Sequence, residues 1–291
     1  MTKGLTAVPI DEQFFEQWIG RQECQRDVLT CVPLNALAAT LDREDRTYTP
    51  AGEVPPLWHW LYFLPLAHQS AVGPDGHPLR GGFLPPITLP RRMWAGSRLS
   101  FEGALPVGAE VERTSTILDV TQKTGRSGSL IFVKLLHELA VEGQVRVREE
   151  QDIVYYRDAP SPNEPAPRAQ PAPTNAQWTR ELFPDPVLLF RYSALTFNGH
   201  RIHYDRPYAT QEEGYPGLVV HGPLIATLLM NLLRDERPSA KVTAFSFRAL
   251  RPIFDQRSMR VCGCEEQAER IHLWAEDAEG FLCMDAWAEL A

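Results

Sequence analysis

The residue types best suited to proton transfer gather in one short segment of this chain. Residues 197–205 read Phe-Asn-Gly-His-Arg-Ile-His-Tyr-Asp, which brings an amide, two imidazoles and a carboxylate close together. Imidazole changes charge near neutral pH and can accept and return a proton. The competing interpretation is structural, with one helix ended and the next one capped by these polar residues. The candidates are, for catalysis, Asn198, His203 and Asp205, and, for substrate contacts, His200 and Tyr204.

A second motif, His221-Gly222-Pro223, opens an apolar run, and its glycine stands nineteen residues after His203. The first N–H groups of a helix lack partners within the helix and lie at its positive end, so they can stabilise a developing negative charge. Glycine also lets a ligand carbonyl approach the backbone closely. We predict that the Gly222 N–H binds an oxyanion and that His221 contacts the substrate. A tight entry into a buried helix is the competing interpretation.

Two further spacings could suit a metal ion. His200-x-x-His203 offers two imidazoles, but a zinc site needs a third ligand nearby, and these histidines are predicted to lie in a loop. Cys262-Gly-Cys264 could be a metal or redox pair, yet alternation within a strand explains it as well. We therefore expect no bound metal.

Composition narrows the class of protein. A net charge of −8 over 291 residues argues against nucleic acid as the main partner. The first residues lack the apolar core of a signal peptide, and no run reaches the roughly 18–20 apolar residues of a membrane span. The five scattered cysteines suit a reducing compartment. We expect a cytoplasmic protein without a membrane partner.

A proline-rich segment predicts two domains. Residues 158–174 contain six prolines, which exclude a helix interior or a central strand. The segment is therefore predicted to be an extended linker between halves at 1–157 and 175–291.

The two halves resemble each other at an offset of 146 residues. Phe101 and Pro106 recur as Phe247 and Pro252. Period-two alternation after each copy predicts antiparallel strands, at 111–120, 130–139 and 143–155, and at 258–264, 270–275 and 281–288.

Each predicted sheet is preceded by an apolar helical candidate, at 57–64 and at 223–234, and residues 11–27 suggest an extra amphipathic helix. The predicted fold class is α+β. Two antiparallel sheets, each wrapping a buried helix and related by an internal duplication, make a double hot-dog.

The two motifs together resemble the MaoC-type hydratase family of hot-dog proteins, which includes (R)-specific enoyl-CoA hydratases. The family motif is Asp-x-Asn-Pro-x-His, followed by a Val-His-Gly-Met-type helix start. His203 falls on the family histidine and Gly222 on the glycine whose N–H binds the thioester oxygen. The family aspartate is Asn198 here. An amide can orient water but cannot accept its proton at neutral pH, so His203, or a carboxylate such as Asp205, must carry the acid–base work.

The Phe-Asn-x-His-Arg-Ile-His-Tyr-Asp version is similar to a subgroup of type-2 hydroxyacyl-thioester dehydratases, mesaconyl-C4-CoA hydratases and itaconyl-CoA hydratases. Segments at 91–97, 125–128 and 149–155 support this resemblance. It implies hydration of a C5 dicarboxylic acyl-CoA (itaconyl-CoA or mesaconyl-C4-CoA) to citramalyl-CoA. It implies no cofactor beyond the CoA of the substrate, and one site per chain, because the first half is degenerate. A free carboxylate on the acyl group would need a cation, for which the candidates are Arg91, Arg92 and Arg98.

Alternatives remain at this point. A 3-hydroxyacyl-carrier-protein or acyl-CoA dehydratase of fatty-acid-type synthesis would use the same chemistry on a longer chain. A non-catalytic acyl-thioester-binding protein would account for the amide at Asn198. A thioesterase is disfavoured, because no strong serine or cysteine nucleophile motif stands out. Monomer and homodimer are both compatible with the sequence, since two hot-dog halves in one chain can pair internally.

Overall fold

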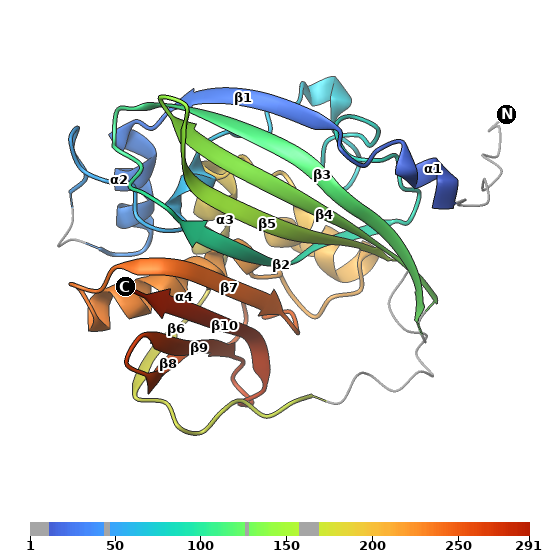
Figure 1. Cartoon of the computed structure of the whole chain (residues 1–291). Helices are drawn as coiled ribbons and strands as arrows, with labels where there is room; N and C mark the ends of the chain where they lie inside the picture. The colour runs from blue at the N-terminus through green and yellow to red at the C-terminus, as the bar shows by residue number, and fades with distance from the viewer. Residues whose placement is uncertain (1–11, 44–46, 126–127, 157–168) are drawn as a thin grey trace, which may run out of the picture.

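One continuous antiparallel sheet organises the chain in the computed structural model, which describes residues 12–43, 47–125, 128–156 and 169–291. Its strand order is β1-β3-β4-β5-β2-β7-β10-β9-β8-β6 (Figure 1). The strands of the first half are β1 Gln22–Val28, β2 Arg91–Phe101, β3 Glu110–Gly125, β4 Gly128–Val141 and β5 Gln144–Tyr156. Those of the second half are β6 Trp178–Leu182, β7 Val242–Ala249, β8 Met259–Gln267, β9 Arg270–Glu276 and β10 Leu282–Leu290. The six strands predicted from alternation are confirmed.

The halves join where β2 pairs with β7. Leu99 lies opposite Phe245 in this ladder, and these two residues are separated by the 146-residue offset of the sequence repeat. The strand order of the second half also repeats that of the first half in reverse. One pair of equivalent residues thus marks the centre of the junction between the two copies, which supports an internal duplication and confirms the double hot-dog prediction. This pairing also joins one edge strand of each half to the other half, so neither of these two edges stays unpaired.

The second half wraps a long buried helix. Helix α4, Gly222–Glu236, packs against β6, β8, β9 and β10. Its residues from Leu224 to Leu233 are all buried, because the sequence is apolar nearly all round. The helix predicted at 223–234 is confirmed.

The first half has no such helix among its described residues, so the prediction for 57–64 is wrong. Only a single 3₁₀ turn forms there, η1 Trp58–Leu61. Leu57 and Phe63 on either side of it have positive φ angles of 71° and 54°, and Pro65 follows, so the turn cannot extend into a helix. The turn still packs on the central helix, where Trp58 Nε1 donates to Asn231 Oδ1 of α4 at 3.2 Å.

The prediction of a helix over 11–27 is also wrong in its extent. A short helix, α1 Glu12–Glu16, is followed by strand β1, in which residues alternate between more and less exposed positions. Two longer helices lie next to each other outside the central one, α2 Cys31–Thr40 and α3 Pro186–Leu195. A second short 3₁₀ turn, η2 Gln69–Ala71, leads into the loop before β2.

The predicted linker lies largely outside the described residues, which resume at 169. Its last part lies along the β9–β10 turn, where the Ala172 N–H donates to the Gly280 carbonyl at 2.9 Å. The two-domain division at 158–174 therefore stays a prediction.

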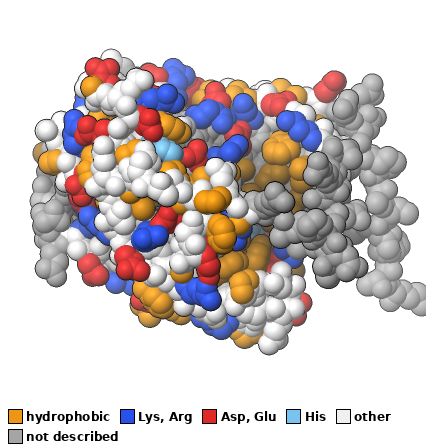
Figure 2. Space-filling view, turned by 90° about the horizontal axis from the view of Figure 1, so that it is seen from below, with side chains coloured by type: hydrophobic (Ala, Val, Ile, Leu, Met, Phe, Trp, Pro, Cys, Tyr) orange, Lys and Arg blue, Asp and Glu red, His pale blue; other side chains and the backbone are white. Residues whose placement is uncertain are grey.

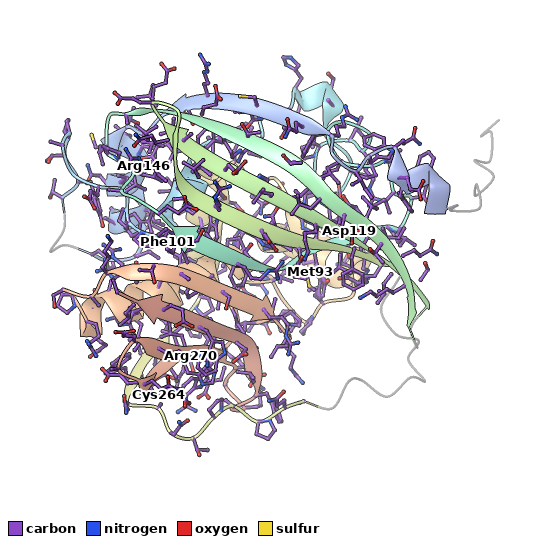
Figure 3. All side chains as sticks on the ribbon, viewed as in Figure 1. Met93, Phe101, Asp119, Arg146, Cys264 and Arg270 are labelled. Atoms are coloured by element: carbon purple, nitrogen blue, oxygen red, sulfur yellow. The ribbon has the colours of Figure 1, made fainter. Side chains whose placement is uncertain are left out.

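The cysteine pair lies at the far end of the sheet from the first half. Cys264 is on β8, next to β9 with Arg270, whereas Met93 marks β2 (Figure 3). Cys262 and Cys264 are buried neighbours on one face of β8, and burial raises the pKa of both thiols. Strand alternation accounts for the pair.

The surface seen in Figure 2 mixes acidic and basic side chains and does not gather the basic ones into a stripe. Among the described residues, no helix is long and apolar enough to cross a bilayer. The expectation that nucleic acid is not the partner stays a prediction, supported by the net charge of −8.

Candidate active site

The segment that carries the candidate histidines is a compact loop between two helices. Helix α3 is capped by Asp185, whose carboxylate accepts from the backbone N–H groups of Val187 and Leu188. The chain leaves α3 through Phe197 at a φ of 51°. Asn198 Oδ1 then accepts from the His200 N–H at 3.0 Å, and a 3₁₀ turn follows, η3 Arg201–His203.

Asp205 ends this loop and starts the next turn. Its carboxylate accepts from the Arg201 guanidinium at 2.7 and 2.9 Å and from the Tyr208 N–H at 3.2 Å. A π-helical turn follows, η4 Tyr208–Glu212. The capping interpretation therefore holds for Asp205, and both carboxylate oxygens have partners. Tyr204 is 42% exposed, and its hydroxyl donates to the Gly199 carbonyl.

His203 lies at the centre of the candidate site. Its side chain is buried, and Nδ1 lies 2.7 Å from the Val219 carbonyl oxygen. A carbonyl can only accept, so Nδ1 carries the proton and Nε2 has a free lone pair. Burial lowers the pKa of His203 to about 4. The ring is therefore neutral at pH 7, with Nε2 as a proton acceptor.

His221 packs directly against this ring. The two imidazoles stack with centroids 3.7 Å apart, and His221 Nε2 lies 2.8 Å from Ser193 Oγ. His221 Nδ1 is buried and has no hydrogen-bond partner among the described residues. This nitrogen is therefore a buried polar atom whose hydrogen-bonding capacity is not used by the described residues.

Gly222 follows at the first position of α4. The side chain of His221 does not cap the helix, although His221 stands at the N-cap position. No atom of another described segment lies within 4 Å of the place that a Cβ on Gly222 would take. The structure thus brings His203, His221 and Gly222 together, with open space beside the Gly222 backbone.

A loop of the first half reaches this site, which sequence reasoning missed. The segment 73–76 forms a turn in which the Gly76 N–H donates to the Gly73 carbonyl at 3.0 Å. His77 follows, and its ring lies 4.0 Å from that of His200, centroid to centroid. Pro74-Asp75-Gly76 is a recognisable turn sequence, but nothing local shows that it meets residue 200.

The three candidate arginines lie in different surroundings. Arg92 is half-buried and close enough to His77 and His200 to depress the pKa of both. It makes no hydrogen bond or ion pair with another described side chain. Arg91 instead donates to the Glu213 carbonyl at 2.9 Å. Arg98 is bound to Glu150 and Asp152 on the exposed sheet face.

Asp75, His77 and His200 could each offer a metal-ligand atom, with these atoms within 4.8 Å of one another. This set differs from the predicted His200-x-x-His203 pair, in which His203 Nδ1 is already bound to a carbonyl. His77 Nδ1 lies 3.1 Å from Asp75 Oδ2, a hydrogen-bond distance that needs no ion. The absence of a metal stays an expectation.

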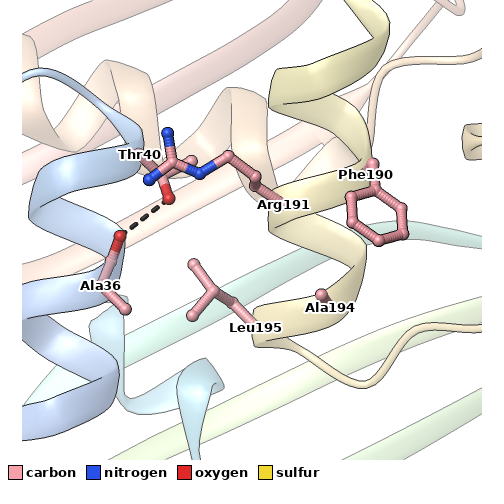
Figure 4. A pocket seen from close by; sticks show the side chains of 6 residues that line it. All are labelled: Ala36, Thr40, Phe190, Arg191, Ala194 and Leu195. Atoms are coloured by element: carbon pink, nitrogen blue, oxygen red, sulfur yellow. Dashed lines mark hydrogen bonds between the residues drawn. The ribbon is translucent and has the colours of Figure 1, made fainter.

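An apolar hollow lies elsewhere, between α2 and α3 (Figure 4). The Thr40 hydroxyl at its rim is bound to the Ala36 carbonyl within α2. None of the candidate catalytic residues lines it. Its lining is Ala36, Thr40, Phe190, Arg191, Ala194 and Leu195.

Comparison with known families and proteins gives concordant matches. The family model for hydroxyacyl-thioester dehydratase type 2 matches residues 57–255. The chain is 48% identical over 276 residues to the mesaconyl-C(4)-CoA hydratase of Chloroflexus aurantiacus, covering 94% of this chain and 96% of that protein. It is 27% identical to the mitochondrial hydroxyacyl-thioester dehydratase type 2 of Schizosaccharomyces pombe, covering 86% and 91%.

Solved structures agree on the fold. A MaoC-like dehydratase from Phytophthora capsici superposes with a TM-score of 0.70 at 13% identity, covering 98% of this chain and 99% of that one. A Mycobacterium tuberculosis protein with a double hotdog fold gives a TM-score of 0.59 at 12% identity, covering 96% and 98%. At these identities the likeness concerns the fold alone.

Proposed function

The chain belongs to the hydroxyacyl-thioester dehydratase type 2 family, and we propose that it adds water to an unsaturated CoA thioester whose acyl group also carries a free carboxylate. Its class, a hydro-lyase of the hydratase or dehydratase type, follows from the family and from the 48% identical hydratase. The substrate is the proposed part, with mesaconyl-C4-CoA and itaconyl-CoA as the candidates. CoA then enters as part of the substrate and no other cofactor is required.

The observation that carries this proposal is the joint placement of His203 and Gly222, which follows from the stack of His203 on His221, the residue before Gly222. Each supplies one half of the chemistry that hydration needs. In mesaconyl-C4-CoA, water attacks Cβ, and its oxygen forms the new C–O bond while the C=C π pair moves towards Cα and the thioester oxygen. In itaconyl-CoA the C=C joins Cβ to the methylene carbon, so a proton must first move from Cα to that carbon to give the same Cα=Cβ double bond. One water proton passes to His203 Nε2 and is then delivered to Cα, so that the net change is the addition of one water molecule.

The backbone N–H of Gly222 stabilises the negative charge that develops on the thioester oxygen. One such oriented donor contributes about 3–4 kcal/mol to lowering a barrier. A positioned base typically contributes about 10²–10⁴-fold in rate. The stacked, neutral His221 keeps the His203 ring in place, and its open Nδ1 is available to a substrate atom.

Arg92 supports a dicarboxylic acyl group. A half-buried guanidinium without an ion pair in the described part of the chain, placed near the candidate catalytic histidines, suits a free carboxylate of the substrate. Arg91 and Arg98 already bind protein groups, so they are weaker candidates for this role.

A panel of thioesters tests the proposal, with hydration followed by the loss of enoyl absorbance for mesaconyl-C4-CoA and crotonyl-CoA and by chromatography of the product for itaconyl-CoA. We expect higher kcat/KM for mesaconyl-C4-CoA or itaconyl-CoA than for crotonyl-CoA. A preference for long-chain enoyl groups on a carrier protein would instead favour the dehydratase of fatty-acid-type synthesis, which the family description also suits. Binding without turnover of any thioester would identify a non-catalytic binding protein.

A further inference from the structure

Helix α3 carries a row of apolar side chains that are open to solvent. Four large ones, Phe183, Val187, Phe190 and Phe197, are each between 51% and 64% exposed. The exposed Ala194 lies between the last two of them. Spacings of three and four residues place all five on one side of the helix and its two ends. We call these five residues the α3 face.

The neighbouring helix α2 extends this apolar surface. The hollow between the two helices is lined by Ala36 on α2 and by Phe190 and Ala194 on α3 (Figure 4). One turn before Ala36 on α2 lies Val32, which is 70% exposed. Monomeric proteins rarely expose a contiguous apolar patch larger than a few hundred Å², and larger patches mark interaction sites. The α3 face therefore indicates a docking surface.

Helix α3 places one acidic and one basic side chain beside this face. The Asp185 carboxylate accepts from the N–H groups of Val187 and Leu188, so it lies at the edge of the face near Val187. Arg191 follows Phe190 and is exposed, and it makes no hydrogen bond or ion pair with another described residue. An acidic carrier protein or a membrane surface would call for several basic side chains. One charge of each sign suits neither.

A second copy of the chain fits both the apolar face and its charges. Two α3 helices that meet antiparallel across a two-fold axis, with Phe190 against the partner's Val187, bury one apolar face on the other. The same arrangement brings Arg191 of each subunit beside the partner's Asp185, because both pairs of positions are centred near residue 188. An ion pair then flanks the apolar contact on each side of the axis.

We propose that the protein forms a homodimer through the α3 face, with α3 of each subunit antiparallel to that of its partner. This interface is separate from the β2–β7 junction, which joins the two halves within one chain. Phe197 directly precedes Asn198, so the interface adjoins the start of the histidine loop in each subunit. The inference does not depend on the proposed substrate or on the hydration chemistry.

Sedimentation velocity over a range of protein concentrations tests the proposal. We expect the wild-type chain to form a dimer with a Kd in the micromolar range or tighter. Phe190→Asp places a charge at the centre of the α3 face and should raise this Kd at least about 10²-fold, because burying an unpaired carboxylate opposes association. Leu66→Asp is the matched control and should leave the Kd unchanged, since Leu66 is 74% exposed in the loop between η1 and η2.

Two charge variants test the antiparallel arrangement. Arg191→Glu sets a carboxylate against the partner's Asp185 and should raise the Kd about tenfold. Adding Asp185→Asn removes that repulsion while the asparagine can still cap α3, so the double variant should regain most of the lost affinity. A loss in Arg191→Glu that Asp185→Asn does not relieve would refute the antiparallel pairing.

A wild-type chain that sediments as a monomer at every concentration would overturn the inference. A dimer whose Kd is the same in Phe190→Asp and in the wild type would also overturn it, because the contact would then use another surface. Circular dichroism checks that each variant is folded, which we expect because Phe190 is exposed in the single chain. Both overturning results leave the proposed hydratase intact, and a dimer that hydrates no enoyl thioester would refute the proposed function alone.

Discussion

The imidazole of His203 lies flat against that of His221, with ring centroids 3.7 Å apart and ring planes inclined by 18°. Separate bonds hold the two rings, one to the Val219 carbonyl and one to Ser193 Oγ. Burial lowers the pKa of both histidines. The stack therefore holds His203 in one orientation, neutral and with Nε2 open.

Replacing His203 should separate catalysis from binding. In His203→Asn the side-chain amide can still donate to the Val219 carbonyl, whereas the atom equivalent to Nε2 is lost. We expect kcat to fall about 10²–10⁴-fold with a limited change in KM, as for a base that acts in the transition state. His203→Ala should show a similar loss. Steady-state hydration assays measure this, and turnover close to wild type in either variant would refute the assignment.

Adding a methyl group at Gly222 should block the oxyanion position without disturbing the fold. The space beside this residue is open, so Gly222→Ala meets no described neighbour outside its own helix. We expect kcat to fall about 10²-fold, a loss on the scale of removing one oxyanion donor. Thermal unfolding should remain near that of the wild type. Full activity together with normal stability would exclude this backbone N–H from the reaction.

We expect Arg92 to set the preference for acyl groups that carry a free carboxylate. We expect Arg92→Met to lower kcat/KM about 10²-fold or more for mesaconyl-C4-CoA, because a buried carboxylate would lose its charged partner. The loss on crotonyl-CoA should be much smaller. Arg98→Met serves as the control, since Arg98 lies on the exposed sheet face and binds Asp152. Equal losses of Arg92→Met on both substrates would argue against a carboxylate-binding role.

We expect acid to destabilise this protein at a higher pH than protonation of its carboxylates alone would. The pKa of His203 is about 4 in the folded protein and 6.5 in the unfolded chain. The unfolded state therefore binds more protons between these pH values, and stability present above pH 6.5 is lost as pH falls towards 4. For His203 the expected loss from pH 7 to 5 is about 2 kcal/mol. Urea unfolding at both pH values measures this loss.

The matching variant is His203→Asn, which cannot take up a proton in the unfolded state. Its stability should decline less steeply between pH 7 and 5 than that of the wild type. His77, His200 and His221 also have lowered pKa values, so part of the slope should remain. Parallel slopes for the two proteins would show that His203 is not buried as a neutral ring.

Much of the candidate site was accessible from local sequence. The Phe197–Asp205 segment and the Gly222 helix start both appear where they were predicted, because caps, turns and helix entries are set by neighbouring residues. The central helix and the six predicted strands followed from the spacing of apolar residues. These features depend on interactions over a few residues, and the spacing of apolar residues along the chain reflects such interactions.

Predictions failed where local pattern and tertiary packing disagree. Residues 57–64 are apolar enough for a buried helix, yet they form one 3₁₀ turn between two residues with positive φ. Strand β1 was mistaken for part of a helix, because its pairing with β3 depends on residues about ninety positions away. Neither outcome is recorded in the short-range pattern of the chain.

Local sequence already specifies the repeated strands, the helix that begins at Gly222 and the histidine loop that precedes it, since each follows from backbone preference and apolar periodicity. Which charged side chains lie close together depends instead on the folded chain. Folding pairs Arg98 with surface carboxylates, places Arg92 near His200, and brings Asp75 and His77 of the first half to the histidines of the second. The physical reason is that a close approach such as that of Gly76 to Gly199 depends on how the whole sheet places two distant loops.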